Sequence, residues 1–405
     1  MSFNYVGDLE ISKSWMNRAL ILQAQQNDIE IVGESTAADV VLLKQALKDF
    51  KSGKTEFFVG LGGTTFRFLS LFISRFAGQY KIKAKKKLFD RPQKELIDLL
   101  NQLGVESQLN RQQDLFEIKS QGWIQPKIIK IQAQDSSQFA SGLVLSSLKL
   151  PRDQRIEIAP NMISQDYFKY TISVMQQAGC AIRYDEQTAV VDIPGQMTIT
   201  RKKLVGEVDV SSFFALAVAA VLAGKVNLTN WNKNSLQPDM KFVSLFKDAG
   251  LIFESENNFA VAKQPLQKNI IANLSNCPDL FPVLAVLAAF TPGVSKLFGA
   301  KQLVHKESNR IEKTYELLTR CGFQCHKLSD GLEIKGNPQA TYRARDTIVF
   351  DPDHDHRMAF AAAILILKGF PIQMTEPQVI LKSYQDFYKH IGLNALDEMV
   401  TKTYL

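Results

Sequence analysis

One small pattern occurs six times in this chain and restricts its possible folds more than any other feature. In each copy, a cluster of polar or charged residues is followed by a run of small apolar residues long enough for a helix; the clusters begin at Ser12, Gly62, Asp135, Asp209, Cys277 and Asp353. The runs, such as residues 213–222, have almost no polar stripe, and a helix that is apolar all round is a buried one. The N-terminus of a helix favours anions, because its N–H groups are free and the dipole is positive there. The pattern predicts six buried helices whose chemistry lies at their N-termini.

A second, amphipathic helix follows each buried one. Five of them are expected to end at a glycine, which can adopt the left-handed conformation that stops a helix. The predicted helices are 94–103, 166–178, 240–249, 309–321 and 385–391, before Gly104, Gly179, Gly250, Gly322 and Gly392. The repeating unit is therefore strand, buried helix, strand, amphipathic helix and a pair of strands. Successive clusters from Gly62 onward begin 68 to 76 residues apart, but the first two only 50 apart, so the first repeat has no room for its strand pair.

Composition excludes several classes of protein. A chain of 405 residues is expected to form two domains. No apolar run is long enough to span a membrane, and the first ten residues lack a signal-peptide pattern. The four scattered cysteines predict neither a disulfide framework nor a zinc site, which favours a reduced, cytoplasmic protein. The net charge of +7 has one dense basic run, residues 81–87, which we interpret as an edge strand with a solvated face rather than a nucleic-acid site.

Several helix starts in the first half of the chain could bind anions. Lys13, Ser14 and Arg18 place two cations and a hydroxyl at one start, which suits a phosphate but is also common in caps and surface charges. Arg91 precedes a proline and should be extended, able to bind a carboxylate or phosphate or to form a structural salt bridge. The remaining candidates are neutral donors for which N-capping is the favoured interpretation of the serines: Ser136, Ser137, Gln138, Ser164 and Tyr167.

The second half carries more charge. Lys306, Glu307 and Arg310 lie at one helix start, either as a solvated, capped end or as a carboxyl group among cations suited to proton transfer. Asp279 is either a first-turn acid or a general base, and Lys382 is by default a surface lysine. The run 353–357, Asp-His-Asp-His-Arg, invites a metal interpretation, but its arginine opposes a divalent ion and no second cluster completes a shell.

In this order, the motifs resemble the 5-enolpyruvylshikimate-3-phosphate synthase family. The resemblance covers nearly the whole chain and is carried by the motifs at 13–20, 136–139, 306–311, 355–359 and 382–383. It implies an α/β enolpyruvyl transferase fold, an inside-out α/β barrel of two domains with three βαβαββ repeats each. The expected domains are 12–207, with the shortened first repeat, and 1–11 with 208–405, with the active site in the cleft between them.

The resemblance also implies the reaction. The 5-hydroxyl of shikimate 3-phosphate attacks C2 of phosphoenolpyruvate as C3 is protonated, and the tetrahedral adduct then loses phosphate. Asp279 would be the base, Lys13 and Glu307 proton-transfer groups, and His356 their assistant. The residues expected to bind shikimate 3-phosphate are Lys13, Ser14, Arg18, Ser136, Ser137, Gln138, Ser164, Tyr167, Gln302 and Lys306. Those expected to bind phosphoenolpyruvate are Lys13, Gly63, Arg91, Gln138, Arg310, Arg357 and Lys382.

The resemblance implies a cytoplasmic monomer that needs no cofactor or metal and whose partners are its two small-molecule substrates, with neither nucleic acid nor membrane. The chain departs from the family pattern at Ile11, Leu61, Gln302 and Asn309, which replace glycine, asparagine, asparagine and aspartate. Two alternatives stay open: a non-catalytic relative that binds phosphorylated ligands, suggested by Leu61 and the short first repeat, and an enolpyruvyl transferase acting on UDP-N-acetylglucosamine. The second lacks support because the chain has no cysteine where that family carries one on a mobile loop.

Overall fold

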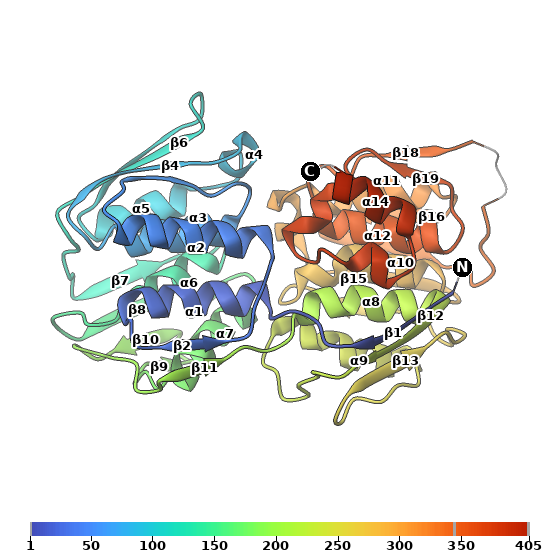
Figure 1. Cartoon of the computed structure of the whole chain (residues 1–405), viewed down its shortest axis with the longest axis horizontal. Coiled ribbons are helices and arrows are strands. Elements are labelled where there is room, and N and C mark those ends of the chain that lie inside the picture. Colours follow the sequence, from blue (N-terminus) through green and yellow to red (C-terminus); the bar gives the residue numbers. More distant parts are fainter. Residues whose placement is uncertain (1, 343–345, 403–405) are drawn as a thin grey trace. The chain divides into compact units, whose positions relative to one another are not determined.

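The computed structural model describes residues 2–342 and 346–402, and they divide into two compact units (Figure 1). The N-terminal unit runs from Ile11 to Glu207, and the C-terminal unit comprises the residues up to Glu10 and those from Val208 onward. The sequence-based division placed Ile11 in the other unit. Ile11 belongs to the N-terminal unit because its backbone N–H donates to the carbonyl of Glu34 at 3.0 Å.

The N-terminal unit contains seven helices and ten strands in its described residues. Its helices are α1 (Lys13–Gln25), α2 (Ala38–Lys51), α3 (Gly63–Ile73), α4 (Lys86–Phe89), α5 (Lys94–Gln102), α6 (Gln138–Leu145) and α7 (Gln165–Gln177). Its strands are β2 (Glu30–Val32), β3 (Glu56–Phe58), β4 (Gly78–Lys83), β5 (Glu106–Asn110), β6 (Leu115–Ser120), β7 (Ile128–Ile131), β8 (Gln154–Ile158), β9 (Arg183–Asp185), β10 (Val190–Ile193) and β11 (Lys203–Val205).

The C-terminal unit has the same alternation of helices and strands. Its α-helices are α8 (Val210–Ala223), α9 (Lys241–Asp248), α10 (Phe281–Ala289), α11 (Arg310–Arg320), α12 (His356–Leu367), α13 (Phe387–His390) and α14 (Asn394–Lys402). Its 3-10 helices are η1 (Pro238–Met240), η2 (Pro278–Leu280), η3 (Lys301–His305) and η4 (Pro377–Lys382). Its strands are β1 (Phe3–Gly7), β12 (Gly224–Leu228), β13 (Phe259–Ala262), β14 (Ile271–Asn273), β15 (Val294–Phe298), β16 (Gln324–Leu328), β17 (Gly331–Lys335), β18 (Ile348–Phe350) and β19 (Ile372–Met374).

Every sheet contains one parallel pair of strands. In the three four-stranded sheets the orders are β3-β4-β6-β5, β7-β8-β10-β9 and β14-β15-β17-β16, and the first two strands of each are parallel. A buried helix, α3, α6 or α10, joins the two strands of each of these pairs, as a parallel connection requires. The last two strands form the antiparallel pair that the sequence predicts at the end of a repeat.

Two strands pair outside the repeat in which the chain order places them. Strand β1 precedes α1 but pairs in parallel with β12, which follows α8; β11 precedes α8 but pairs in parallel with β2, which follows α1. The first and fourth repeats thus exchange their opening strands. The first repeat is short as predicted, because in the described chain α2 leads directly to β3 without a strand pair.

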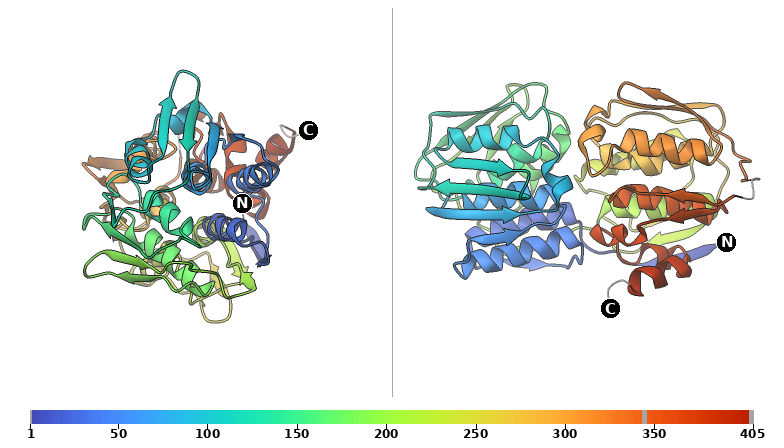
Figure 2. Two further views of the ribbon diagram at one scale, coloured as in Figure 1. Left: turned by 90° about the vertical axis from the view of Figure 1, so that its left-hand side faces the viewer. Right: turned by 90° about the horizontal axis from the view of Figure 1, so that it is seen from above.

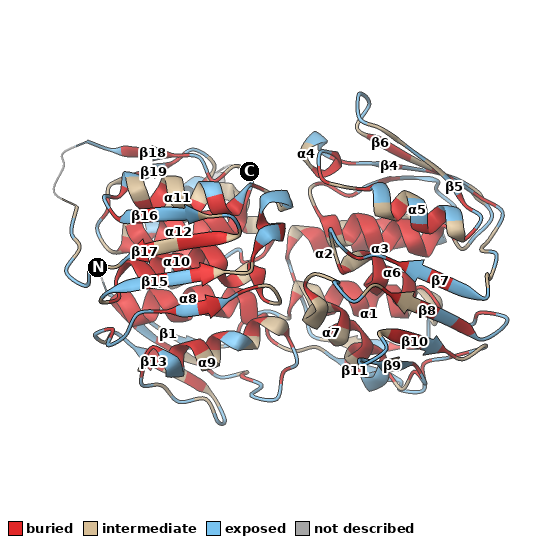
Figure 3. Cartoon of the chain, turned by 180° about the vertical axis from the view of Figure 1, so that it is seen from behind, coloured by how far each residue is buried: buried red, intermediate tan, exposed pale blue. Residues whose placement is uncertain are grey.

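Three helices without a polar stripe form the centre of each unit. In the N-terminal unit α1, α3 and α6 pack against one another, and in the C-terminal unit α8, α10 and α12 do the same. Every residue of α8 and α10 is buried, which Figure 3 shows as continuous red helices. The strands and the amphipathic helices lie around these three helices in each unit (Figure 2). The prediction of six buried helices is confirmed, each beginning at its polar cluster.

Two local predictions need correction. Residues 81–87 do not form an edge strand: β4 pairs with both β3 and β6, and residues 86–89 are helical. The alternation of exposed Lys81 and Lys83 with buried Ile82 reflects a sheet with one solvated face, which an inner strand shows equally well.

The glycines predicted to end helices have positive φ values between 73° and 86°. The last predicted helix, 385–391, is shorter in the structure, where α13 spans only Phe387–His390. The sequence did not predict α14.

No helix in the described part of the chain has both the length and the apolar character needed to cross a bilayer.

Candidate functional site

Lys13 lies on the first turn of α1, held there by the cap of the helix. Ser12 caps α1 by accepting from the N–H of Trp15 at 3.4 Å. The Lys13 ammonium is 3.2 Å from a carboxylate oxygen of Asp39, a buried residue near the start of α2. The hydroxyl of Thr65 donates a hydrogen bond to the backbone carbonyl of Asp39 at 2.9 Å. Asp39 therefore links the starts of α1, α2 and α3.

Arg18 is buried one turn further along α1. Its guanidinium donates to the hydroxyl of Thr171 at 2.8 Å and to the carbonyls of Ser14 at 2.7 Å and Tyr167 at 3.0 Å. It also lies over the ring of Tyr170, 5.2 Å from its centroid. Burial lowers the pKa of Arg18 to about 10, which leaves the side chain charged at neutral pH. Arg18 therefore links two of the predicted ligands, Ser14 and Tyr167, and uses three of its five N–H groups to do so.

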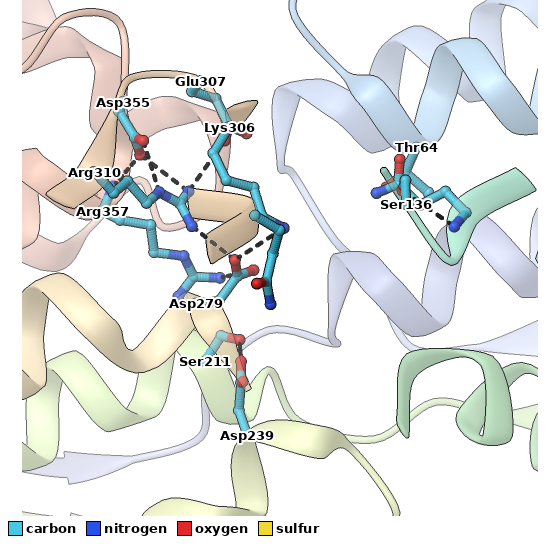
Figure 4. Close-up of polar contacts among 12 residues, drawn as sticks. Thr64, Ser136, Ser211, Asp239, Asp279, Lys306, Glu307, Arg310, Asp355 and Arg357 are labelled. Carbon is cyan, nitrogen blue, oxygen red and sulfur yellow. Dashed lines mark hydrogen bonds and ion pairs between the residues drawn. The ribbon is translucent and has the colours of Figure 1, made fainter. Parts of the chain in front are cut away.

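A second buried arginine, Arg67 on α3, organises the start of α6. It donates to Gln138 Oε1 at 2.7 Å and to the hydroxyl of Ser136 at 3.2 Å, and its guanidinium lies 4.6 Å from the ring of Phe139. The amide of Gln138 in turn donates to the hydroxyl of Thr64 at 2.9 Å. Figure 4 shows Thr64 and Ser136 in this group.

The absence of a side chain at Gly63 lets Arg91 approach the start of α3. A Cβ atom on Gly63 would lie 3.0 Å from Arg91 Nη1 and 3.4 Å from Gln138 Oε1. Gly63, Arg91 and Gln138, all predicted ligands of phosphoenolpyruvate, are thus brought together in the N-terminal unit. Leu61, in the turn before α3, is half-buried.

Of the predicted capping serines, Ser136 accepts from the N–H of Gln138, the first residue of α6, at 3.2 Å, and the other two do not cap with their side chains. Ser137 and Ser164 are the N-cap residues of α6 and α7, but neither makes a side-chain capping hydrogen bond. Ser164 has φ +52°, a left-handed conformation that costs a non-glycine residue about 1 kcal/mol or more. Such strain at a helix start is common at functional sites.

Arg310 is the centre of the charged cluster in the C-terminal unit (Figure 4). Its side chain is 1% exposed and contacts three carboxylates. It binds Asp355 through Nε at 2.8 Å and Nη2 at 3.2 Å, Asp279 through Nη1 at 2.7 Å, and Glu307 through Nη2 at 3.1 Å. Burial lowers the pKa of Arg310, but Asp355, Asp279 and Glu307 outweigh burial and raise it well above its usual value.

Asp279 lies on η2, immediately before α10, among three cations. Besides Arg310, its carboxylate contacts Arg357 at 3.3 Å and Lys306 at 3.7 Å. Burial raises the pKa of Asp279, but the charges of Lys306, Arg357 and Arg310 overcome burial and hold the pKa well below its usual range. Asp279 is therefore ionised at neutral pH, and its side chain remains 21% exposed.

Lys382 and Glu307 form the outer ion pair of the cluster. The ammonium of Lys382, at the end of η4, is 2.7 Å from Glu307 Oε1, and both side chains are mostly buried. Lys382 is thus not the surface lysine that its sequence context suggests by default. Gln302, on η3, donates to the carbonyl of Ser275 at 2.8 Å, next to the turn that carries Asp279.

A strained turn sets the start of α12. Asp353 and His354 both have left-handed backbones, with φ of +57° and +60°. Asp355 then caps α12 by accepting from the N–H of Arg357 at 2.9 Å, while the same carboxylate binds Arg310. His356 is buried beside it, its Nδ1 4.0 Å from Asp355 Oδ1. The turn therefore places His356 and Arg357 at the helix N-terminus.

Two of the possible metal ligands in residues 353–357 are paired with other side chains. His354 pairs with Glu376 at 2.7 Å, and the carboxylate of Asp355 is occupied by Arg310. In the described ranges, no three His, Cys, Asp or Glu side chains gather in a way that could hold a metal ion.

Sequence reasoning missed three residues that position the site: Asp39, Arg67 and Asp355. Asp355 lies within a motif that carries the family resemblance, but the resemblance assigns it no role, and Arg67 is not among the predicted site residues. One signal could have found Arg67. A charged residue inside an otherwise apolar, buried helix needs a specific partner, and the partner of Arg67 is the predicted ligand Gln138.

The two clusters have the chemistry of anion sites. The C-terminal unit gathers Arg310, Arg357, Lys306 and Lys382 around three carboxylates at the starts of α10, α11 and α12. The N-terminal unit gathers Lys13, Arg18, Arg67 and Arg91 with hydroxyl and amide donors at the starts of α1, α3 and α6. Cations and helix N-termini bind phosphate and carboxylate groups, and an ionised carboxylate among them can accept a proton.

Comparison with known proteins agrees with this chemistry. The family model described as EPSP synthase (3-phosphoshikimate 1-carboxyvinyltransferase) matches residues 18–391. A 3-phosphoshikimate 1-carboxyvinyltransferase from Pyrococcus furiosus is 30% identical over 401 residues, covering 94% of this chain and 94% of the relative. A protein of the same name from Vibrio campbellii is 27% identical over 340 residues, covering 83% and 78%.

Solved structures show the same fold. An EPSP synthase from Acinetobacter baumannii matches with a TM-score of 0.74 at 18% identity, covering 97% of this chain and 96% of that chain. The enolpyruvyl transferase NikO from Streptomyces tendae matches with a TM-score of 0.72 at 14% identity, covering 96% and 94%. The predicted α/β enolpyruvyl transferase fold is therefore confirmed. Since the family model spans most of the chain, the protein belongs to the EPSP synthase (3-phosphoshikimate 1-carboxyvinyltransferase) family.

Proposed function

We propose that the protein transfers the enolpyruvyl group of phosphoenolpyruvate to the 5-hydroxyl of shikimate 3-phosphate and releases phosphate. In the addition step, the hydroxyl oxygen bonds to C2 of phosphoenolpyruvate, its proton goes to a base, and C3 gains a proton. In the elimination step, C3 loses a proton and the C2–O bond to phosphate breaks, which leaves an enol ether. Family membership supports this reaction.

The observation that carries the proposal is the cluster around Arg310. Arg310, Arg357, Lys306 and Lys382 gather there at three helix starts, and both substrates are anions. A phosphate or carboxylate that binds Arg310, Arg357 or Lys306 competes with Asp279 for their charge. The pKa of Asp279 should then rise towards its usual value, which makes it a stronger base when the substrates are present.

The roles of individual residues follow the same proposal. Asp279 is the base for the 5-hydroxyl, Lys13 and Glu307 transfer protons, and His356 assists beside them. The shikimate-phosphate ligands are Lys13, Ser14, Arg18, Ser136, Ser137, Gln138, Ser164, Tyr167, Gln302 and Lys306. The phosphoenolpyruvate ligands are Lys13, Gly63, Arg91, Gln138, Arg310, Arg357 and Lys382. Since these sets draw on both units, we propose that each substrate binds residues of both.

Phosphate release by the purified protein tests the function. With both substrates present, phosphate should appear in step with consumption of phosphoenolpyruvate, and mass spectrometry should find the enol ether of shikimate 3-phosphate. No release, together with tight binding of shikimate 3-phosphate, would establish the non-catalytic alternative. UDP-N-acetylglucosamine in place of shikimate 3-phosphate should give no release, since the family match favours the shikimate acceptor. The cytoplasmic location and the monomeric state remain predictions from the sequence.

A further inference from the structure

Glu95 connects two parts of the candidate site in the N-terminal unit. It lies on the first turn of α5, four residues after Arg91. Its carboxylate accepts a hydrogen bond from the backbone N–H of Ala133 and another from that of Asp135. Both N–H groups belong to the turn between β7 and α6, which leads directly to Ser136 and Ser137.

This turn needs an external support. Ala133 has φ +49°, a left-handed conformation that a residue with a Cβ adopts only at a cost of about 1–3 kcal/mol. It is completely buried, and its carbonyl accepts from the N–H of Ile163 at 3.1 Å. Hydrogen bonds from backbone N–H groups to a carboxylate are stronger than neutral ones, so Glu95 is well suited to hold the strained turn.

Arg67 makes a parallel connection between the same two segments. Its Nε donates to Gln93 Oε1 at 3.4 Å, on the segment that begins α5. Its Nη1 donates to Ser136 and Gln138, on the segment that begins α6. Glu95 and Arg67 therefore fix the start of α5, which follows Arg91, against the start of α6, which carries the proposed shikimate-phosphate ligands.

We propose that Glu95 is a positioning residue for shikimate 3-phosphate: its ionised carboxylate holds the 133–135 turn so that Ser136, Ser137 and Gln138 face the substrate. The proposal rests on the proposed function, because it takes these three residues as ligands. It adds a residue that does not itself touch the substrate, and it predicts that binding weakens when Glu95 gains a proton.

The charges around Glu95 set the pH at which this occurs. Burial raises the pKa of Glu95 to about 6; the N–H of Ala133 and the charge of Arg67 lower it, and the charge of Asp135 raises it. The charged groups that face Glu95 are thus Asp135, from the turn, and Arg67, from α3. Above about pH 6 Glu95 is ionised and a strong acceptor, and below it the protonated acid accepts more weakly. Because burial raises the pKa of Glu95 in the folded protein, ionisation of Glu95 lowers the free energy of unfolding relative to the protonated acid, so the neutral E95Q variant should remain folded.

The kinetic test compares Glu95→Gln with the wild type across pH. The ratio of their KM values for shikimate 3-phosphate cancels the titration of the substrate's own phosphate. We expect E95Q to raise this KM about fivefold at about pH 8 and the ratio to fall to about 1 at about pH 5, with kcat changed less than about twofold. Asp98→Asn, on an exposed position of the same helix, is the matched control and should keep a ratio near 1 throughout. An E95Q ratio that is independent of pH would overturn the proposal.

A second measurement does not depend on activity. In the wild type, the amide proton resonances of Ala133 and Asp135 should shift together with a midpoint near pH 6, and E95Q should abolish the shift while Asp98→Asn retains it. Unshifted Ala133 and Asp135 amides would overturn the role of Glu95. If the wild type released no phosphate but these amides titrated, the proposed function would fail while the contact between Glu95 and the turn stood.

Discussion

The side chain of Ile11 lies where two glycines leave space for it. The family resemblance predicts glycine at this position, before Ser12 and Lys13. A Cβ on Gly33 would lie 2.4 Å from Ile11 Cγ1, and a Cβ on Gly206 would lie 2.5 Å from Ile11 Cγ2. Two glycines therefore provide the space that Ile11 occupies, at the point where the chain enters the N-terminal unit.

This packing predicts a specific coupling between Ile11 and Gly206. Gly206→Ala should destabilise the protein by about 1–3 kcal/mol, because the new methyl group meets Ile11 and lies 3.2 Å from the ring of Trp15. In an Ile11→Gly background the same change should cost less, by about 1 kcal/mol. Urea unfolding of the four proteins in this cycle measures the coupling. Equal costs in both backgrounds would show that Ile11 does not fill this space.

Asp279 gives the most direct prediction for catalysis. Asp279→Asn keeps the size of the side chain but removes the proposed base, so kcat should fall by about 10²- to 10⁴-fold. Steady-state phosphate release measures the effect, with Asp248→Asn, an exposed aspartate at the end of α9, as the control. The change also removes a carboxylate whose pKa is lowered in the folded state. Its contribution to stability is present above the usual pKa of aspartate and is lost as pH falls through the folded value, so D279N should be less stable than the wild type at neutral pH and equally stable in strong acid. A kcat within about twofold of the wild type would refute the role of Asp279 as base.

The sequence predicted the charged residues at helix starts better than the residues that hold them. Arg310 and Lys382 were recognised because they belong to motifs with a familiar order. Asp39, Glu95 and Arg67 were not among the predicted site residues, because each contacts a segment that is distant in sequence. A contact between α3 and α6 depends on how the two helices pack, and no local pattern encodes it.

At the scale of elements, prediction succeeded where one local cause dominates. The buried helices lack a polar stripe, and the amphipathic ones end at glycines with positive φ, so both could be predicted from residues close in sequence. The inner position of β4 could not. Alternating lysines reveal that one face of a sheet is solvated, but the number of neighbouring strands depends on pairing with β3 and β6.

Because α3 and α6 pack closely at Gly142, alanine should be less stable than glycine there, which is the reverse of the usual helix propensity. Replacing a helical glycine by alanine usually stabilises by about 1 kcal/mol. Here a Cβ would lie 2.7 Å from Leu71 Cδ1 and 3.2 Å from Phe68 Cδ1, and both side chains are completely buried. Gly142→Ala should therefore destabilise by about 1–2 kcal/mol in urea unfolding, because overpacking outweighs propensity. Lys44→Ala, on an exposed position of α2, is the control and should have little effect. A stabilised G142A protein would mean that α3 and α6 can move apart freely.

At the scale of the whole molecule, the chain crosses between its units twice, at residues 10–11 and 207–208. Each crossing leaves one strand on the other side: β1 pairs with β12, and β11 pairs with β2. Both crossings were expected from the family resemblance alone. Strands of three and five residues carry too little pattern to indicate their partner, whereas the motifs of the family span both units.

We predict that one phosphoenolpyruvate molecule binds residues of both units. Arg91 comes from the N-terminal unit and Lys382 from the C-terminal unit. If one phosphoenolpyruvate molecule binds both, Arg91→Ala and Lys382→Ala should each raise its KM about tenfold or more, since each removes a charged hydrogen bond.

The double variant distinguishes a shared site from two separate ones. Residues that bind one ligand together act as a unit, so the effects of R91A and K382A should not add. Lys85→Ala, which changes an exposed cation before α4, should leave the KM for phosphoenolpyruvate unchanged and serves as the control. Strictly additive effects, or an effect of R91A on shikimate 3-phosphate alone, would contradict binding of one phosphoenolpyruvate molecule by both arginine and lysine.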